Sequence, residues 1–188
     1  MTISVVLADA NILFSRTLRD YFLYLADAGA IEIHWSQRIL DEMSRNLRKE
    51  IGLSRADTDR LEALMNAYIE YALIDVEAEA LATVADVAMD TKDRHVVAAA
   101  VSAEADILLT DNTAHFPAEW MARHGIALLD SAALLTRLAE TFPDKLLAAH
   151  RQTVRLSRRS EADILATLES IVGEPVAGTI RALAADHG

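Results

Sequence analysis

The sequence predicts an α/β protein with a central, mostly parallel sheet, followed by an all-helical C-terminal segment. Three observations lead to this prediction. Short, largely apolar runs at residues 5–8, 106–111 and 126–129 have the composition of strands buried on both faces of a parallel sheet. Amphipathic helical patterns lie between these runs. Beyond Pro143 the strand patterns stop and only helical patterns remain.

The first half of the chain alternates strands and helices. The expected elements are strands at 5–8, 31–35 and 72–76 and helices at 15–28, 37–50, 54–71 and 77–87. Gly29 and Gly52 follow the first two helices, where a glycine favours helix termination. Ser54 and Asp57 have the spacing of a capping pair and therefore open the third helix.

The second half continues the same alternation. The expected elements are a helix at 90–101, a strand at 106–111, a short helix at 116–124, a strand at 126–129 and a helix at 131–140. The body of the first of these helices, residues 96–101, consists of valine and alanine, which indicates close packing on the sheet. Alternating strands and helices predict right-handed crossovers between parallel strands.

The chain is expected to divide into an α/β domain at 1–141 and a helical extension at 142–188. In the extension we expect helices at about 144–156, 161–172 and 176–185, with a small core of their own. Ser160 and Asp163 form a capping pair for the second helix, and Gly173 separates it from the third.

Composition narrows the possible functions. The net charge of −11 argues against broad, unspecific nucleic-acid binding, which needs a basic face, but not against local contact with RNA. The absence of cysteine excludes disulfides and thiolate metal sites. The sequence shows neither a signal-peptide pattern nor a membrane-spanning run, so the expected location is the cytoplasm, without membrane attachment.

Several acidic residues occupy positions at which parallel α/β sheets usually form their functional sites. Asp9 and Asp111 each follow a buried strand, Asp93 lies at a helix start, and Glu42 lies on the polar side of the second helix. Converging carboxylates without basic neighbours repel one another unless a cation is bound. Mg²⁺ and Mn²⁺ prefer oxygen ligands, and such a site suits metal-assisted hydrolysis of a phosphodiester.

Each of these residues also has a purely structural interpretation. Asp9 and Asp111 are also typical of turns and helix caps, Asp93 can belong to a helix N-terminal box with Asp90, and Glu42 can be one solvated acid among several. His95 and His115 more often make ordinary hydrogen bonds than bind metal. Ser15 and Thr110 either cap helices or orient a ligand or water.

Four segments in this order resemble the PIN-domain ribonuclease family, and specifically the VapC-like toxins of toxin–antitoxin pairs. The segments are residues 7–13 (LADANIL), Glu42, residues 91–100 (TKDRHVVAAA), and residues 106–112 (DILLTDN) followed by 115–117 (HFP). The resemblance covers about residues 3–130. It implies a three-layer α/β/α fold and an endoribonuclease that depends on Mg²⁺ or Mn²⁺.

Carried over position by position, the resemblance implies that Asp9, Glu42 and Asp93 bind the metal. The fourth site residue is Asp111 or, alternatively, Asn112. The side chains expected to support the site are Asn11, Ser15, Thr110 and Asn112.

The resemblance also implies partners. Toxins of this type act on RNA and are held inactive by a small antitoxin, often with a basic residue that reaches the acids. The extension resembles that of one VapC-like subgroup, and a homodimer is plausible on the same ground. The basic run from Arg151 to Arg159 either contacts the RNA backbone or the antitoxin, or is a solvated helix face.

Two other functions remain open at this point. One is a PIN-type nuclease of RNA processing or of DNA flap cleavage, which uses the same acids. The other is a binding protein that keeps the fold without the chemistry. The intact set of Asp9, Glu42 and Asp93 argues against the second.

Overall fold

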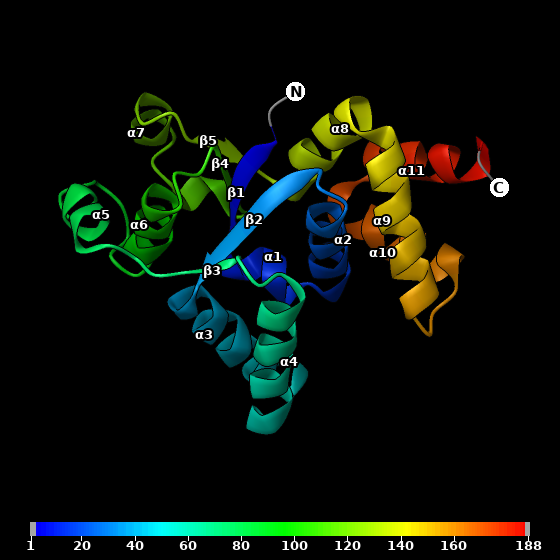
Figure 1. The fold of residues 1–188 in the computed structure, drawn as a ribbon, viewed down its shortest axis with the longest axis horizontal. Helices are drawn as coiled ribbons and strands as arrows, with labels where there is room; N and C mark the ends of the chain where they lie inside the picture. The colour runs from blue at the N-terminus through cyan, green and yellow to red at the C-terminus, as the bar shows by residue number, and fades with distance from the viewer. Residues whose placement is uncertain (1–2, 187–188) are drawn as a thin grey trace.

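The computed structural model describes residues 3–186 and contains a five-stranded parallel sheet between two layers of helices (Figure 1). The strands are β1 (Ser4–Ala8), β2 (Ile31–Ser36), β3 (Leu73–Ile74), β4 (Ile107–Leu109) and β5 (Ala127–Leu129), in the spatial order β3-β2-β1-β4-β5. The predicted α/β class is confirmed.

The helices of the α/β part lie on both faces of the sheet. They are α1 (Ala10–Phe14), α2 (Arg16–Asp27), α3 (Gln37–Asn46), α4 (Arg55–Tyr68), α5 (Ala78–Thr83), α6 (Arg94–Ser102), α7 (Ala118–Arg123) and α8 (Ser131–Thr141). Figure 1 shows α2 on one side of the strands and α5, α6 and α7 on the other. The strand order therefore reverses between β1 and β4, which is the point where open α/β sheets bind ligands.

The central strand owes its position to its composition. Val6, Leu7 and Ala8 are fully buried, and β1 pairs in parallel with both β2 and β4, so that Val6 lies between Ile33 and Ile107. A strand without a solvent-facing side needs apolar residues at consecutive positions. The carboxyl ends of β1 and β4 are thereby fixed side by side.

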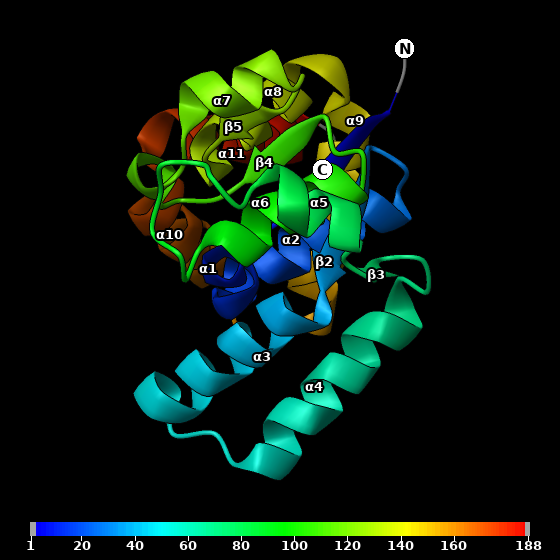
Figure 2. The same cartoon turned by 90° about the vertical axis from the view of Figure 1, so that its left-hand side faces the viewer.

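The predicted helix boundaries are largely confirmed by their caps. The Ser15 side chain accepts a hydrogen bond from the Leu18 amide at the start of α2, and Ser54 and Asp57 form both bonds of a capping box at α4. Helix α3 widens into a π-helical turn at Leu47–Ile51 before Gly52, whose φ of +76° favours glycine. Together α3 and α4 form a hairpin that extends beyond the end of β2 (Figure 2).

Several elements are shorter than expected, and two are new. The helix expected from residue 90 begins only at Arg94, because residues 91–93 form a turn. The strand expected at 106–111 spans Ile107–Leu109, the helix expected at 116–124 spans Ala118–Arg123, and a 3₁₀ turn at Thr113–His115 is new. The strand expected at 72–76 is reduced to Leu73–Ile74, and the helix expected at 77–87 spans only Ala78–Thr83. Between β1 and α2 the chain forms the additional short helix α1, because the Asp9 side chain caps it.

The extension consists of α9 (Pro143–Leu156), α10 (Glu161–Val172) and α11 (Glu174–Asp186), close to the predicted ranges. The expected separate core is wrong, since Leu146, Leu168 and Val172 belong to the same buried cluster as the sheet. A buried chain of hydrogen bonds joins the two parts: Tyr21 Oη lies 2.6 Å from His150 Nδ1, and His150 Nε2 lies 2.9 Å from Glu161 Oε1. Helix α2 therefore packs on both the sheet and the extension.

No helix within residues 3–186 combines the length and the apolar character needed to cross a membrane.

Candidate metal centre at the carboxyl edge of the sheet

Asp9 is the most constrained side chain at this edge. Its Oδ1 accepts the Ala10 amide at 2.6 Å, and its Oδ2 accepts the Thr110 hydroxyl at 2.8 Å and the Asn11 side-chain amide at 2.7 Å. Only 6% of the residue is exposed. Burial raises the pKa of Asp9, and the carboxylates of Glu42 and Asp93 raise it further, against the lowering effect of the bonds from Thr110 and Ala10.

Asn11 and Thr110 connect the ends of β1 and β4. The Asn11 side-chain amide also donates to Thr110 Oγ1 at 2.8 Å, and Asn11 Oδ1 accepts the Asp111 amide at 3.1 Å. Thr110 Oγ1 in turn accepts the Asn112 amide at 3.1 Å. The two side chains thus hold Asp9 and the loop after β4 in one geometry.

Asp93 occupies the position before α6 but does not cap the helix. Its backbone is helical, with φ −93° and ψ −9°, and its side chain makes no capping hydrogen bond. Among the described residues, Asp93 Oδ2 is buried without a hydrogen-bond partner, and His115 Nδ1 lies 3.6 Å from it. Burial raises the pKa of Asp93. A buried oxygen without a donor is costly unless something binds it.

Glu42 faces the same edge from α3 and is held by His95. The His95 Nε2 atom lies 3.4 Å from Glu42 Oε2, and hydrogen bonding to His95 lowers the pKa of Glu42. His95 comes from α6, and only 5% of its surface is exposed. Its Nδ1 lacks a hydrogen-bond partner within residues 3–186. The imidazole therefore connects α3 and α6 across the site.

Asp111 and Asn112 directly follow Thr110 in the chain, whereas Ser15 lines a groove between α2 and the α3–α4 hairpin. Asp111 is exposed, and its Oδ1 accepts the Ser131 amide at 2.8 Å, at the start of α8. The exposed Asn112 contacts Thr110 through its backbone amide, and the Ser15 hydroxyl caps α2. The choice between Asp111 and Asn112 as fourth site residue stays a prediction.

The residues suit a hard divalent ion in kind, although the carboxylates are not gathered around one point. In the described part of the chain, no three His, Asp or Glu side chains are grouped closely enough to hold a metal. Glu42 instead contacts His95, and Asp93 contacts His115. Side-chain rotations of Glu42 and Asp93 toward Asp9 would bring together oxygen donors of the type that Mg²⁺ and Mn²⁺ prefer, one of them, Asp93 Oδ2, without a present hydrogen bond.

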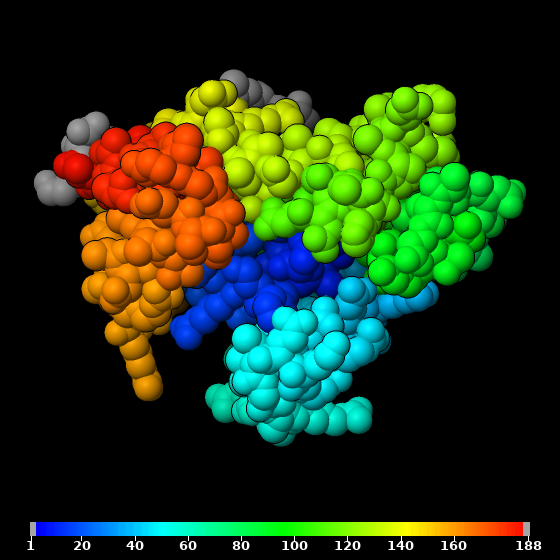
Figure 3. Space-filling view, turned by 180° about the vertical axis from the view of Figure 1, so that it is seen from behind, coloured from blue at the N-terminus to red at the C-terminus, as the bar shows by residue number. Residues whose placement is uncertain are grey.

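Asp9 and the Oδ2 atom of Asp93 are shielded from water. Figure 3 shows the N-terminal part of the chain, in blue, set back between the α3–α4 hairpin in cyan, the segments around α6 in green and the extension in orange. Partial exclusion of water strengthens the interaction between the carboxylates and a cation.

His95 is the residue of this group whose role the sequence did not reveal. Its position two residues after Asp93 turns it to the buried face of α6, whereas its contact with Glu42 depends on where α3 lies. No local pattern carries that information.

Comparison with protein families gives a match to the model described as the PIN domain over residues 5–114, which is more than half of the chain. Searches of curated proteins and of solved structures gave no match. The matched range contains Asp9, Glu42 and Asp93, and PIN domains are generally metal-dependent nucleases. The chain therefore belongs to the PIN domain family, which indicates a nuclease-type function.

Proposed function

We propose that the protein is a metal-dependent endoribonuclease and the toxin of a VapC-like toxin–antitoxin pair. The observation that carries the nuclease proposal is the buried, unpartnered Oδ2 of Asp93 at the edge that also presents Asp9 and Glu42. Burial raises the pKa of both Asp9 and Asp93, and the Glu42 carboxylate raises both further, which favours a bound cation. When bound, Mg²⁺ or Mn²⁺ would supply hydroxide from water and stabilise charge on the phosphoryl oxygens.

Residues of this protein position the carboxylates that would bind the metal ion. Thr110, Asn11 and the Ala10 amide fix both oxygens of Asp9, so this carboxylate enters the reaction without reorganisation. His95 keeps Glu42 ionised and directed to the site edge. Asp93 offers its free oxygen. These roles support hydrolysis of a phosphodiester in single-stranded RNA.

The test is cleavage of a fluorescent single-stranded RNA by the purified protein with Mn²⁺ or Mg²⁺, beside a DNA strand of the same sequence. We expect RNA cleavage that EDTA stops and that Asp9→Asn or Asp93→Asn reduces at least about hundredfold. Asp90→Asn is the matched control, because Asp90 is exposed and pairs with Lys92 at 3.4 Å. Cleavage of the DNA strand alone would favour the flap-nuclease alternative, and equal activity of all variants would contradict the proposal.

The toxin proposal requires a protein partner, and one surface suits it. A groove of about 900 Å³ lies between α2, the α3–α4 hairpin and the end of α9, and exposed Leu64, Tyr68 and Leu156 line it. Exposed apolar surface of this extent is typical of protein docking sites. The resemblance to VapC-like toxins supports a small antitoxin as the occupant.

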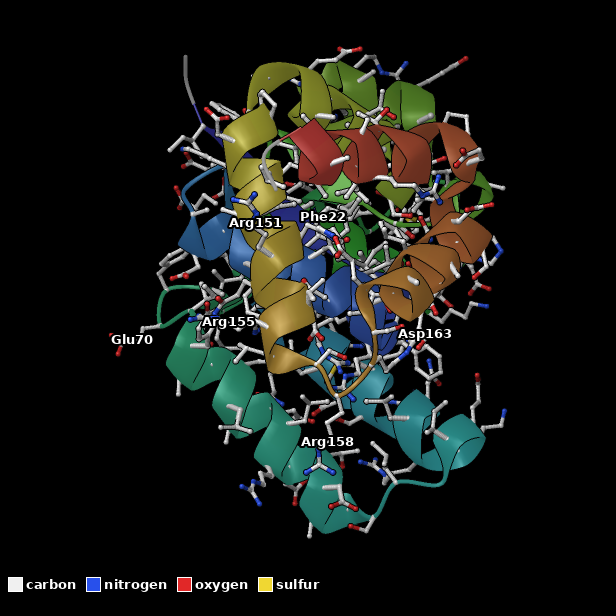
Figure 4. All side chains as sticks on the ribbon, turned by 90° about the vertical axis from the view of Figure 1, so that its right-hand side faces the viewer. Phe22, Glu70, Arg151, Arg155, Arg158 and Asp163 are labelled. Carbon is white, nitrogen blue, oxygen red and sulfur yellow. The ribbon has the colours of Figure 1, made fainter. Side chains whose placement is uncertain are left out.

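The basic run lies next to this groove. Figure 4 shows Arg151 and Arg155 on α9 and Arg158 in the connection to α10. Arg159 is engaged within the extension, donating to the Asp163 carbonyl at 2.6 Å. Contact of the other arginines with RNA or with the antitoxin stays a proposal.

Growth distinguishes a toxin from a processing nuclease. Induced expression of the wild-type chain is expected to arrest a bacterial culture, whereas Asp93→Asn at equal protein level does not. Co-expression of the small protein encoded beside the gene should restore growth. Unaffected growth with active nuclease in the lysate would leave an RNA-processing enzyme as the better assignment.

A further inference from the structure

A second feature begins at Asp93 and leads away from the acids. Two adjoining cavities of about 410 Å³ and 600 Å³ share Ala88 and Pro117, and together they form a groove between residues 83–93 and α7. We call it the α7 groove. One end contains Asp93, and the other end contains Trp120 and Arg123. Figure 1 shows α5 and α7, which border it, on the same side of the sheet.

The walls of the α7 groove combine apolar and charged side chains and include one fixed aromatic ring. Phe116 and Val87 are almost buried and line its two parts. Trp120 stacks on His124, with ring centroids 3.8 Å apart and planes inclined by 22°. Because this contact holds the indole plane, a flat ligand meets a preformed platform, and aromatic platforms of this kind stack unpaired nucleobases.

The charges of the groove suit a base better than a phosphate. Asp86 and Glu119 line the part that contains Trp120, where they outnumber the single cation Arg123, and Lys92 in the other part is paired with Asp90 at 3.4 Å. Carboxylates repel phosphate but accept hydrogen bonds from the amino and ring N–H groups of bases. Guanine, adenine and cytosine carry an exocyclic amino group, whereas uracil offers only one ring N–H, which lies between two carbonyl oxygens that carboxylates repel.

We propose that the α7 groove holds one unpaired base of the RNA strand, next to the phosphodiester that is hydrolysed at the metal centre containing Asp93. The base stacks on Trp120 and directs its amino edge to Asp86 and Glu119. Bases with an amino group therefore bind more tightly than uracil. This inference rests on the proposed ribonuclease function and adds to it a base preference next to the cleavage point.

The chain offers a direct signal for this contact. It contains two tryptophans, and the other, Trp35, is fully buried with its Nε1 bonded to Asn66. The ribodinucleotides GpG, ApA, CpC and UpU, with the matching mononucleotides, are titrated into wild-type protein in EDTA, where no metal-dependent cleavage occurs. We expect saturable quenching of tryptophan fluorescence, weakest with UpU, and tighter binding of each dinucleotide than of its mononucleotide.

Substitutions distinguish the contribution of the Trp120 ring to binding from any effect on folding. Trp120→Phe should lose the quenching but keep the affinity for a dye-labelled oligonucleotide within about twofold, while Trp120→Ala should weaken that affinity about tenfold. Glu119→Gln combined with Asp86→Asn should reduce the difference between UpU and the other dinucleotides. Mn²⁺ binding equal to wild type shows that each variant is folded, since none of these residues belongs to the metal centre.

Several results would overturn the inference. These are the absence of quenching with all four dinucleotides, quenching that persists in Trp120→Phe, or equal affinity for UpU. Equal affinity for a mononucleotide and its dinucleotide would point to a free nucleotide as the ligand instead of an RNA strand. Because the binding assay needs no cleavage, base binding without Mn²⁺-dependent activity would refute the nuclease proposal alone, and cleavage without base binding would refute this one alone.

Discussion

At the scale of single residues, the site is defined by the hydrogen bonds that its carboxylates do and do not make. Asp9 has every oxygen occupied by donors from its own loop and from Thr110. Asp93 has a buried oxygen without a donor in the described chain. The first arrangement fixes a ligand in place, and the second leaves a binding position free for a cation.

The buried Oδ2 of Asp93 predicts that Asp93→Asn gains stability relative to the wild type as pH rises. Burial raises the pKa of Asp93 in the folded state, so the folded protein loses stability relative to the unfolded chain as pH rises from the ordinary carboxyl range through this raised pKa. Asparagine does not ionise. The free energy of unfolding of metal-free Asp93→Asn, relative to wild type, should therefore increase over this pH range and then level off. Urea denaturation at several pH values tests this, and a relative loss of stability toward neutral pH would contradict it.

Mn²⁺ binding should make the wild type more stable than Asp93→Asn. Mn²⁺ at about 100 times its Kd stabilises a protein that binds it only in the folded state by about 2.7 kcal/mol. We expect this gain for the wild type and little of it for Asp9→Asn or Asp93→Asn. Calorimetric titration of Mn²⁺ into the three proteins measures the affinity directly, and equal binding by all three would show that these acids are structural.

His95 should act on the metal through Glu42. Loss of a residue that orients a ligand typically lowers metal affinity about 10–100-fold, and His95→Ala removes the Nε2 contact to Glu42 Oε2. His95→Gln retains a donor and should recover part of the affinity. If both variants are folded, as circular dichroism can show, and bind Mn²⁺ as the wild type does, His95 serves only the packing of α6.

At the scale of elements, local rules account for most of the boundaries. The capping box at Ser54 and Asp57 and the glycine after α2 are recognisable because they involve neighbouring residues. The π-helical end of α3 and the two-residue length of β3 depend on how the hairpin and the strand meet the rest of the molecule. For the same reason Asp9, Asn11 and Thr110 were predictable as candidates, whereas the His95–Glu42 contact was not.

The capping box makes a prediction for α4. Ser54→Ala removes the acceptor for the Asp57 amide and should lower the free energy of unfolding by about 1 kcal/mol. Arg55→Ala, one residue later and exposed, is the control. Urea denaturation followed by circular dichroism measures both variants. An unchanged midpoint for Ser54→Ala would mean that the end of the α3–α4 hairpin unfolds independently of the core.

At the scale of the whole molecule, the extension and the sheet share one core. Helix α2 carries both contacts, and the His150 chain to Tyr21 and Glu161 lies within the junction. The sequence showed where strand patterns end and helices continue. It did not show that the helices fold back onto α2, because the sequence of an apolar helix face does not identify the element against which it packs.

A shared core predicts one cooperative transition. Leu168 on α10 is fully buried, and Leu168→Ala should destabilise the entire protein by about 2–5 kcal/mol. Ile171→Ala, on the same helix but 37% exposed, should cost far less. Thermal unfolding followed by both circular dichroism and the fluorescence of Trp35 and Trp120, which both lie in the α/β part, should give coincident transitions. An early transition confined to helical signal would establish the extension as a separate domain.

The lengths of the outer strands limit how copies of this protein can associate. The sheet ends in β3 on one side and β5 on the other, and these strands contain two and three residues. Such short margins offer too few unpaired amides and carbonyls for a neighbouring molecule to add a strand, which is a recognised protection against aggregation. A second copy is therefore not expected to bind by adding a strand to β3 or β5.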